Sequence, residues 1–322
     1  MKRILITGGS GFIGTNLVEY LLTKENVAII NVDTKTPKME SHIFCWRNVD
    51  IRDASKLEAI ISEFKPSCFV HLAAITDLLG RSLDYYDANT KGVHVLINII
   101  QRTSSLKRVL FASSMYVCRP GYQPVDMDDY APHTVYGESK VLTEKIIKGA
   151  ELKTPWVIFR PTSIWGPWFG EPYIDFFNIV LGRKYFHFGK RACRKTYGYI
   201  GNTVQQIEAL INADVKDVDK KVFYLGDWPA YNISDWAEEI AAKKNIWIPQ
   251  IPYFMLQLAG YLGDILKFLK IKFPMSSFRL RNMTTDNIHD LRPIQKLMPV
   301  LPFSRKEGVD ETLEWMMQEG KA

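Results

Sequence analysis

Residues 4–14 read Ile-Leu-Ile-Thr-Gly-Gly-Ser-Gly-Phe-Ile-Gly, an apolar run followed by glycines at positions 8, 11 and 14. The apolar run predicts a short strand, and residues 12–22 carry apolar side chains at helical spacing. In such a turn the first glycine allows a sharp bend, the second lets the backbone approach a pyrophosphate, and the third packs the helix on the strand. The N–H groups at the start of the helix then face the anion. We therefore predict a dinucleotide-binding turn at Gly8, Gly11 and Gly14.

Beyond this turn, apolar strands alternate with amphipathic helices. We expect strands at 27–32, 68–72, 109–112, 156–160 and 222–225, and helices at 55–64, 85–101 and 135–148. Uncharged strands separated by such helices are typical of a parallel sheet covered on both faces. The prediction is an α/β fold with a Rossmann-type doubly wound parallel sheet and a smaller, mixed C-terminal substrate-binding region. The cofactor domain spans 1–165, with 195–226 returning to it, and the substrate domain comprises 166–194 and 227–322.

The composition is that of a globular protein, with 47% hydrophobic and 24% charged residues among 322. These values exclude a disordered or fibrous chain. The net charge of +6 is too small to indicate nucleic-acid binding, although it would suit an anionic small molecule. No run reaches the roughly 18 apolar residues of a membrane span, and the first apolar run is too short for a signal peptide. We expect no transmembrane segment and no nucleic-acid partner.

The four cysteines are Cys45, Cys68, Cys118 and Cys193, and they are widely separated in the sequence. They form no Cys-x-x-Cys pair and no Cys/His pattern with metal-ligand spacing. We therefore expect neither a disulfide framework nor a metal site, and we predict a cytoplasmic location.

Asp33 ends the second predicted strand, at the distance from Gly14 where a carboxylate accepts hydrogen bonds from the adenosine ribose. A 2′-phosphate would be repelled by this carboxylate, so the predicted cofactor is NAD. The neighbouring Lys35 keeps NADP possible.

Tyr136 and Lys140 are four residues apart in a predicted helix and so share one face. An ammonium group there would favour the phenolate and lower the pKa of the tyrosine, which could then exchange a proton with a substrate hydroxyl. Ser113 and Ser114 end another predicted strand, at the edge where open α/β sheets bind ligands. The Tyr/Lys pair alone is weak evidence, but with the glycine turn and the serines it indicates an enzyme.

These features resemble the extended short-chain dehydrogenase/reductase family, in its NAD-dependent sugar-nucleotide epimerase/dehydratase branch. The resemblance covers nearly the whole chain, more weakly towards the C-terminus. The matching segments are TGGSGFIG at 7–14, HLAA at 71–74, SSMYV at 113–117, YGESK at 136–140 and RPTSIWGP at 160–167.

The resemblance implies a role for each matching residue. The catalytic residues would be Ser114, Tyr136 and Lys140. The cofactor would be bound by Gly8, Gly11, Phe12, Ile13, Gly14, Asp33, Asp50, Ile51, Leu72, Ala73, Ala74 and Asn89, together with Tyr136 and Lys140. The substrate would be bound by Ser114, Ser163, Arg194, Lys195, Arg279 and Arg281. The four cations are candidates for holding a diphosphate.

The implied activity is an NAD-dependent epimerase of a nucleotide-diphosphate sugar. A hydride passes from a sugar carbon to NAD, and the transient keto-sugar takes it back on its other face. A role in surface-polysaccharide biosynthesis and a homodimer, paired through the helices near 85–101 and 135–148, are also implied.

The dehydratases of this branch have an acidic pair directly after the catalytic hydroxyl, whereas this chain has Met115 and Tyr116. We therefore do not expect 4,6-dehydration. Ser163 replaces an asparagine of the family, which suggests an unusual substrate.

Two alternatives stay open. The apolar segment 253–271 has helical spacing, and we expect it to form a buried helix pair, although it could also lie against a membrane or line a lipophilic pocket. That segment also resembles 3β-hydroxysteroid-type dehydrogenases, so an NAD(P)-dependent keto-reductase or steroid dehydrogenase is the second interpretation. Arginines in the pocket would favour a nucleotide sugar, and an apolar lining would favour a sterol. A non-catalytic NAD-binding regulator is the third interpretation, which the presence of Ser114, Tyr136 and Lys140 argues against.

Overall fold

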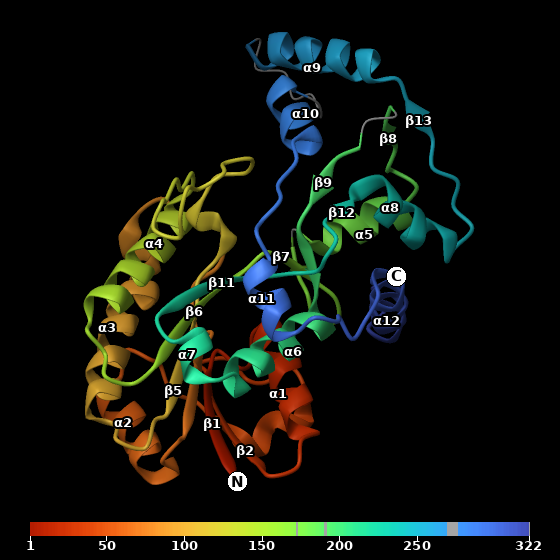
Figure 1. Cartoon of the computed structure of the whole chain (residues 1–322). Coiled ribbons are helices and arrows are strands. Elements are labelled where there is room, and N and C mark those ends of the chain that lie inside the picture. The colour runs from red at the N-terminus through yellow and green to blue at the C-terminus, as the bar shows by residue number, and fades with distance from the viewer. Residues whose placement is uncertain (172, 190–191, 269–275, 322) are drawn as a thin grey trace.

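The computed structural model describes residues 1–171, 173–189, 192–268 and 276–321 of the chain (Figure 1). The strands are β1 (Lys2–Thr7), β2 (Val27–Val32), β3 (Trp46–Arg47), β4 (Cys68–His71), β5 (Arg108–Ala112), β6 (Trp156–Pro161), β7 (Ser163–Trp165), β8 (His187–Phe188), β9 (Arg194–Lys195), β10 (Tyr197–Tyr199), β11 (Lys221–Leu225), β12 (Tyr231–Asn232) and β13 (Gln250–Ile251). The helices are α1 (Phe12–Leu22), α2 (Ala54–Phe64), α3 (Asp87–Arg102), α4 (Val135–Gly149), α5 (Tyr173–Leu181), α6 (Ile200–Asn212), α7 (Val215–Val218), α8 (Ile233–Ala242), α9 (Tyr253–Phe268), α10 (Ser277–Thr284), α11 (Arg292–Leu297) and α12 (Arg305–Gln318). Short 3₁₀ turns are η1 (Glu40–Cys45), η2 (Leu83–Tyr86) and η3 (Met115–Val117).

A seven-stranded sheet with the order β11-β6-β5-β4-β1-β2-β3 forms the centre of the molecule. Every neighbouring pair is parallel. The strand order reverses between β1 and β4, and the loops that follow these two strands open on the same edge. Open α/β sheets bind ligands at such a point. The predicted α/β class and doubly wound sheet are therefore confirmed.

Side chains that alternate along each strand build two apolar cores, one on each face of the sheet. In β1, Ile4 and Ile6 pack with Leu17 of α1, whereas Leu5 packs into the other core with α2 and α3. Figure 1 shows α2, α3 and α4 along one side of the sheet and α1 and α6 along the other. This alternation follows from the two-residue period of a strand, and it explains why the strands contain so few charges.

The region after β6 is built from short strands and helices. Its small sheets pair β7 with β10, β9 with β12 and β8 with β13. Aromatic side chains fill its core, where the indole of Trp165 lies 5.0 Å from that of Trp236 between ring centroids. β11 returns to the central sheet beside β6, with Val222 opposite Ile158. The division into the two predicted domains stays a prediction.

α9 differs from what the sequence suggested. Residues 253–268 form one continuous helix, which passes through Gly260, Gly263 and Asp264 instead of breaking there. The expectation of a buried helix pair is wrong for these residues, because one face of α9 is exposed; residues 269–271 lie outside the described part of the chain. Among the described residues, no helix is both long enough and apolar enough to cross a membrane.

Candidate active site

The glycine turn brings backbone segments into close contact. Gly8 has a φ of +77°, and a Cβ at this position would lie 2.5 Å from the nitrogen of Ala73. A Cβ at Gly14 would lie 2.2 Å from the carbonyl oxygen of Gly8. Side chains at these two positions would therefore push apart β1, α1 and the loop after β4. Gly11 precedes the first turn of α1, which begins with Phe12, and no side chain caps that turn. The backbone N–H groups of this first turn are therefore available to donate hydrogen bonds to an anion.

Asp33 lies at the end of β2, directly beside the glycine turn. Its carboxylate accepts hydrogen bonds from the backbone N–H groups of Ser10, at 3.0 Å, and Lys35, at 2.9 Å. These contacts hold the carboxylate at the edge of the sheet and leave oxygen lone pairs that could accept the hydroxyls of a ribose. The predicted partnership between Asp33 and the glycine turn is thus geometrically possible.

The remaining predicted cofactor residues line the loops that follow β3 and β4. The Asp50 carboxylate lies 2.5 Å from the guanidinium of Arg52, whose hydrogen bond and charge lower the pKa of Asp50. Ile51 is buried against α3. Asn89 bonds to the backbone N–H and carbonyl of Ile75 and donates to Ser139 of α4. Asn89 therefore holds the loop that carries Leu72, Ala73 and Ala74.

Ser114, Tyr136 and Lys140 come together at the carboxyl edge of β5. The Ser114 hydroxyl lies close enough to the Tyr136 side chain to lower the pKa of the phenol, and all three residues are buried. Lys140 donates from Nζ to the carbonyl oxygen of Ala112 at 2.7 Å, so its ammonium is held at the end of the strand. The fold thus brings together the three side chains that the sequence suggested.

The electrostatics of the pair differ from the expected lowering of the tyrosine pKa. Burial raises the pKa of Tyr136 to about 12, while the nearby Ser114 hydroxyl acts in the opposite direction. Burial also lowers the pKa of Lys140 to about 8, because the ammonium has lost water on all sides. Tyr136 is therefore a neutral phenol at neutral pH in this structure, and Lys140 is mostly charged.

A buried ion pair supports this edge of the sheet. Glu144 follows Lys140 by one helical turn, and Arg160 at the end of β6 binds both of its carboxylate oxygens at 2.8 Å. Glu144 also accepts from the Ser113 hydroxyl at 2.5 Å. Burial alone would raise the pKa of Glu144, but the hydrogen bonds and charge of Arg160 hold it below its usual value. Sequence reasoning missed this pair, although its spacing from Lys140 was a signal.

A second unpredicted residue, His71, ends β4 between the glycine turn and the catalytic group. Its Nδ1 lies 2.7 Å from the hydroxyl of Thr7, at the end of the neighbouring β1. Burial lowers the pKa of His71 to about 3, with the charge of Lys140 acting in the same direction, so the ring is neutral. The Thr7–His71 contact ties together the two strands between which the order reverses.

Hydroxyl groups surround Tyr136 on the side that faces the smaller region. Tyr116 packs against the Tyr136 ring at 5.9 Å between centroids. The Tyr173 side chain lies beside Ser163 and Tyr116, and burial raises its pKa. Ser163 also contacts the sulfur of Met115 at 3.8 Å. The predicted substrate residue Ser163 therefore lies in one cluster with Tyr136, the predicted catalytic tyrosine, and Tyr116 and Tyr173 are additions that sequence reasoning missed.

The predicted cationic residues lie further out, and the structure does not bring them together at one point. Arg194 and Lys195 form β9, and the Arg194 backbone N–H donates to Asp286. Arg281 lines a pocket of about 650 Å³ between α9 and α10. The side chain of Arg279 lies outside the described part of the structure.

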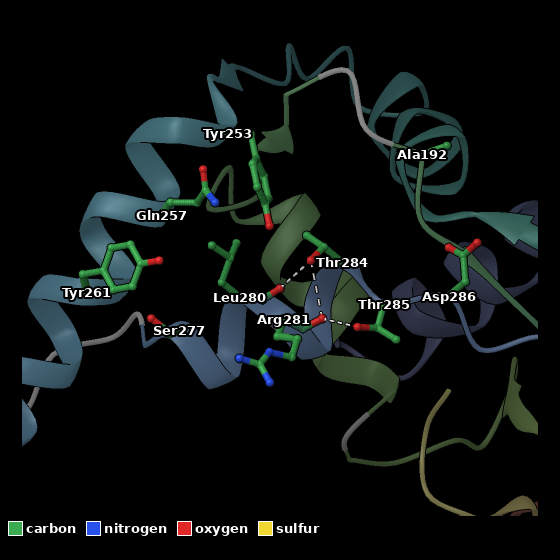
Figure 2. A pocket seen from close by; sticks show the side chains of 10 residues that line it. All are labelled: Ala192, Tyr253, Gln257, Tyr261, Ser277, Leu280, Arg281, Thr284, Thr285 and Asp286. Atoms are coloured by element: carbon green, nitrogen blue, oxygen red, sulfur yellow. Dashed lines mark hydrogen bonds between the residues drawn. The ribbon is translucent and has the colours of Figure 1, made fainter. Parts of the chain in front are cut away.

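Figure 2 shows this pocket, with Tyr253, Gln257 and Tyr261 of α9 facing Leu280, Arg281 and Thr284 of α10. Its remaining lining is Ala192, Ser277, Thr285 and Asp286. Most of these side chains carry a hydroxyl, amide or charged group.

Known proteins resemble this chain along most of its length. It is 27% identical to the N-acetyl-α-D-glucosaminyl-diphospho-ditrans,octacis-undecaprenol 4-epimerase of Escherichia coli O157:H7, over 97% of this chain and 95% of that protein. It is 23% identical to a decarboxylating sterol-4-α-carboxylate 3-dehydrogenase of Candida albicans, over 99% of both chains. Sequence similarity therefore extends both to a 4-epimerase, as the first interpretation expects, and to a sterol dehydrogenase, as the second interpretation expects.

Solved structures share the fold. The UDP-glucuronic acid 4-epimerase of Bacillus cereus has a TM-score of 0.76 at 18% identity, covering 98% of this chain and 99% of that one. The UDP-glucose 4-epimerase of Thermotoga maritima has a TM-score of 0.74 at 21% identity, covering 98% and 99%. The profile of the NAD dependent epimerase/dehydratase family matches residues 4–226, which include the glycine turn and Ser114, Tyr136 and Lys140. The chain belongs to the NAD dependent epimerase/dehydratase family.

Proposed function

We propose that this protein is an NAD-dependent 4-epimerase of a sugar carried on a diphosphate. The observation that carries the proposal is that Ser114, Tyr136 and Lys140 are all buried at the carboxyl edge of β5, with Lys140 one helical turn after Tyr136 in α4 and held by the carbonyl of Ala112. The E. coli relative and both solved structures described above are named as 4-epimerases, which favours carbon 4 as the reacting centre.

The residues present fit NAD. The contacts of Gly8 and Gly14 leave no room for side chains, the first turn of α1 has no side-chain cap, and Asp33 lies beside them. We propose that these groups hold the pyrophosphate and the adenosine ribose. Leu72, Ala73, Asp50 and Ile51 remain predicted contacts of the cofactor.

When bound, NAD would supply a reversible acceptor for the hydride of the sugar carbon. Because the phenol of Tyr136 is neutral in the free protein, it must first lose its proton to solvent. The resulting phenolate takes the proton of the sugar hydroxyl during oxidation and gives it back during reduction. Ser114 donates a hydrogen bond to the same sugar oxygen and so holds it beside the phenol. Lys140 supplies positive charge at the end of β5, which stabilises the phenolate whenever the proton leaves.

Met115 and Tyr116 favour epimerisation over dehydration. Both follow Ser114 directly in η3, where the dehydratases that this chain resembles have carboxyl groups that expel water. A thioether and a half-buried phenol provide no such acid–base pair, since partial burial raises the pKa of Tyr116.

We propose a nucleotide as the first candidate for the carrier of the diphosphate, bound by Arg194, Lys195, Arg279 and Arg281. A polyprenol is the second candidate, favoured by the name of the E. coli relative and by the exposed apolar face of α9. The polar lining of the pocket beside Arg281 argues against a sterol.

Deuterium at carbon 4 provides a direct test. UDP-sugars and a polyprenyl-diphosphate N-acetylhexosamine, each labelled there, are incubated separately with the purified protein. An epimerase converts one of them and keeps the label on carbon 4, because the hydride returns to the carbon that it left. Stoichiometric release of NADH and loss of the label would instead identify a dehydrogenase. The Tyr136→Phe variant is the control for adventitious turnover.

The remaining expectations are part of the same proposal. The protein acts in the cytoplasm, in surface-polysaccharide biosynthesis, as a homodimer paired through α3 and α4. These two helices pack side by side at the outside of the sheet (Figure 1). Sedimentation equilibrium of the protein with a charge introduced at the half-exposed Leu142 of α4 tests the pairing, and an unchanged mass would contradict it.

A further inference from the structure

The outer face of α9 is apolar and has no partner among the described residues. Its exposed hydrophobic side chains are Phe254, Met255, Leu258, Tyr261, Leu262 and Ile265, each between 49% and 64% exposed. With about 100° between successive residues, Phe254, Leu258, Tyr261 and Ile265 form a stripe and the other two flank it. Monomeric proteins rarely expose a continuous patch of this kind without a partner.

The opposite face of α9 is already occupied. Leu256 is buried, and a Cβ at Gly260 would lie 3.2 Å from the backbone nitrogen of Ser277 at the start of α10. Asp264 accepts a hydrogen bond from that same nitrogen. The exposed stripe therefore cannot turn inward without breaking the contact with α10, and its orientation is fixed.

The helix pair stands at the edge of the molecule farthest from β1. Figure 1 shows α9 running across the top of the fold, with α10 below it and the central sheet beyond. Over its 16 described residues, at 1.5 Å each, the helix is about 24 Å long. An exposed apolar face on one side only is typical of a helix that lies in the surface of a membrane.

Charge distinguishes the possible occupants of this face. From Tyr253 to Thr284 the sequence contains Lys267, Lys270, Lys272, Arg279 and Arg281 against the single acid Asp264. Most of the chain's net charge of +6 thus falls in one short segment. A second copy of the chain would bring a like charge against it, whereas anionic lipid headgroups would complement it.

We propose that the exposed stripe of α9 docks on a membrane surface that contains anionic phospholipid. The apolar side chains enter the boundary between headgroups and acyl chains, and anionic phosphates complement the positive net charge of the sequence from Tyr253 to Thr284. The pocket of Figure 2 opens beside this surface, because Tyr261 belongs to both. The inference goes beyond the proposed activity and does not depend on it.

Flotation with vesicles tests the docking. The full-length protein is mixed with vesicles of equal parts phosphatidylcholine and phosphatidylglycerol, or of phosphatidylcholine alone, and centrifuged in a density gradient. We expect the protein to float with the anionic vesicles and to bind at least about tenfold less to the neutral ones. Replacing Phe254 and Leu258 together by Asn should reduce binding to anionic vesicles about tenfold or more.

The matched control replaces Val125 and Val300 by Asn, two exposed apolar residues in loops that are not part of α9. This control variant should float like the unmodified protein. The proposal is overturned if the unmodified protein does not float, or if the α9 variant floats as well as the control. A dimer that the α9 variant abolishes, without flotation, would assign the stripe to a second copy. Epimerase activity on a soluble nucleotide sugar, measured on the same preparations, separates failure of docking from failure of the proposed function.

Discussion

Most helices bury their apolar side chains and expose their charged ones, and α4 and α9 break this rule in opposite ways. α4 buries a tyrosine, a lysine and a glutamate, whereas α9 exposes a stripe of phenylalanine, leucine and isoleucine. A buried charge is stable only with a partner inside the fold, and Glu144 has Arg160 while Lys140 has the carbonyl of Ala112. An exposed apolar stripe requires a partner outside the fold. The first helix therefore indicates chemistry, and the second indicates an interaction.

Removing the phenol of Tyr136 is the most severe test of the chemical side of this comparison. The Tyr136→Phe variant should lose about 10²–10⁴-fold in turnover, because the group that exchanges the proton is gone. NAD binding, measured by calorimetry, should change little, since the glycine turn is untouched. Turnover within a few-fold of the unmodified enzyme would remove Tyr136 from its assigned role.

The buried ion pair gives the next largest effect, this time on folding. Glu144→Gln should lower the free energy of unfolding by about 3–5 kcal/mol, because it leaves the Arg160 guanidinium buried without a carboxylate. The double variant with Arg160→Met should lose less than the single one, since neither charge then remains uncompensated. Denaturant unfolding measures both, and equal losses in the two variants would show that the uncompensated guanidinium of Arg160 is not what destabilises the Glu144→Gln variant.

Replacing helical glycines by alanine should have smaller effects on stability, and two such glycines serve as a test and its control. Gly14→Ala should cost about 1–3 kcal/mol and weaken NAD binding, because its Cβ would overlap the Gly8 carbonyl. Gly149→Ala at the end of α4 meets nothing within 4 Å and should stabilise the protein by about 0.5–1 kcal/mol. Thermal unfolding with and without NAD distinguishes them, and the same response in both variants would contradict the close approach at Gly14.

Lys140 predicts the pH dependence of activity. Because its pKa is lowered to about 8, the ammonium is present below that pH and is lost as the pH rises through it. Turnover should therefore rise about tenfold per pH unit below pH ~8 and level off above it, because further ionisation of Tyr136 is then cancelled by loss of the Lys140 ammonium. Lys140→Arg, which stays charged, should move this levelling-off to higher pH, and a break that stays near pH ~8 would assign it to another group.

The sequence predicted the cofactor side of the molecule better than its outer side, for a physical reason. The glycine turn and the Tyr136–Lys140 pair are local, so their spacing alone fixes which atoms can meet. Glu144 and Arg160 are on different elements, and their contact depends on α4 packing against β6. Tyr173 likewise reaches Tyr116 only through the tertiary fold.

The prediction of a buried helix pair at residues 253–271 was wrong for α9 because helical spacing cannot distinguish burial from exposure. Apolar residues surround most of this helix, so both Leu256 and Leu258 match a core-facing pattern. Only the packing of Gly260 on Ser277 establishes which face is covered. Neither composition nor periodicity contains that information.

The smallest expected effect on stability is that of replacing an exposed leucine of α9, which is compared with a buried leucine of the same helix. Leu256 and Leu258 are two residues apart in α9, 4% and 64% exposed. Leu258→Asn should change the free energy of unfolding by no more than about 0.5 kcal/mol, because the side chain contributes nothing to the core. Leu256→Asn should cost about 2–5 kcal/mol, since it removes a buried side chain and leaves an amide against α10. Denaturant unfolding measures both without any membrane present. Equal losses would mean that the stripe is packed in solution, and the argument for an external partner would then fail at its first step.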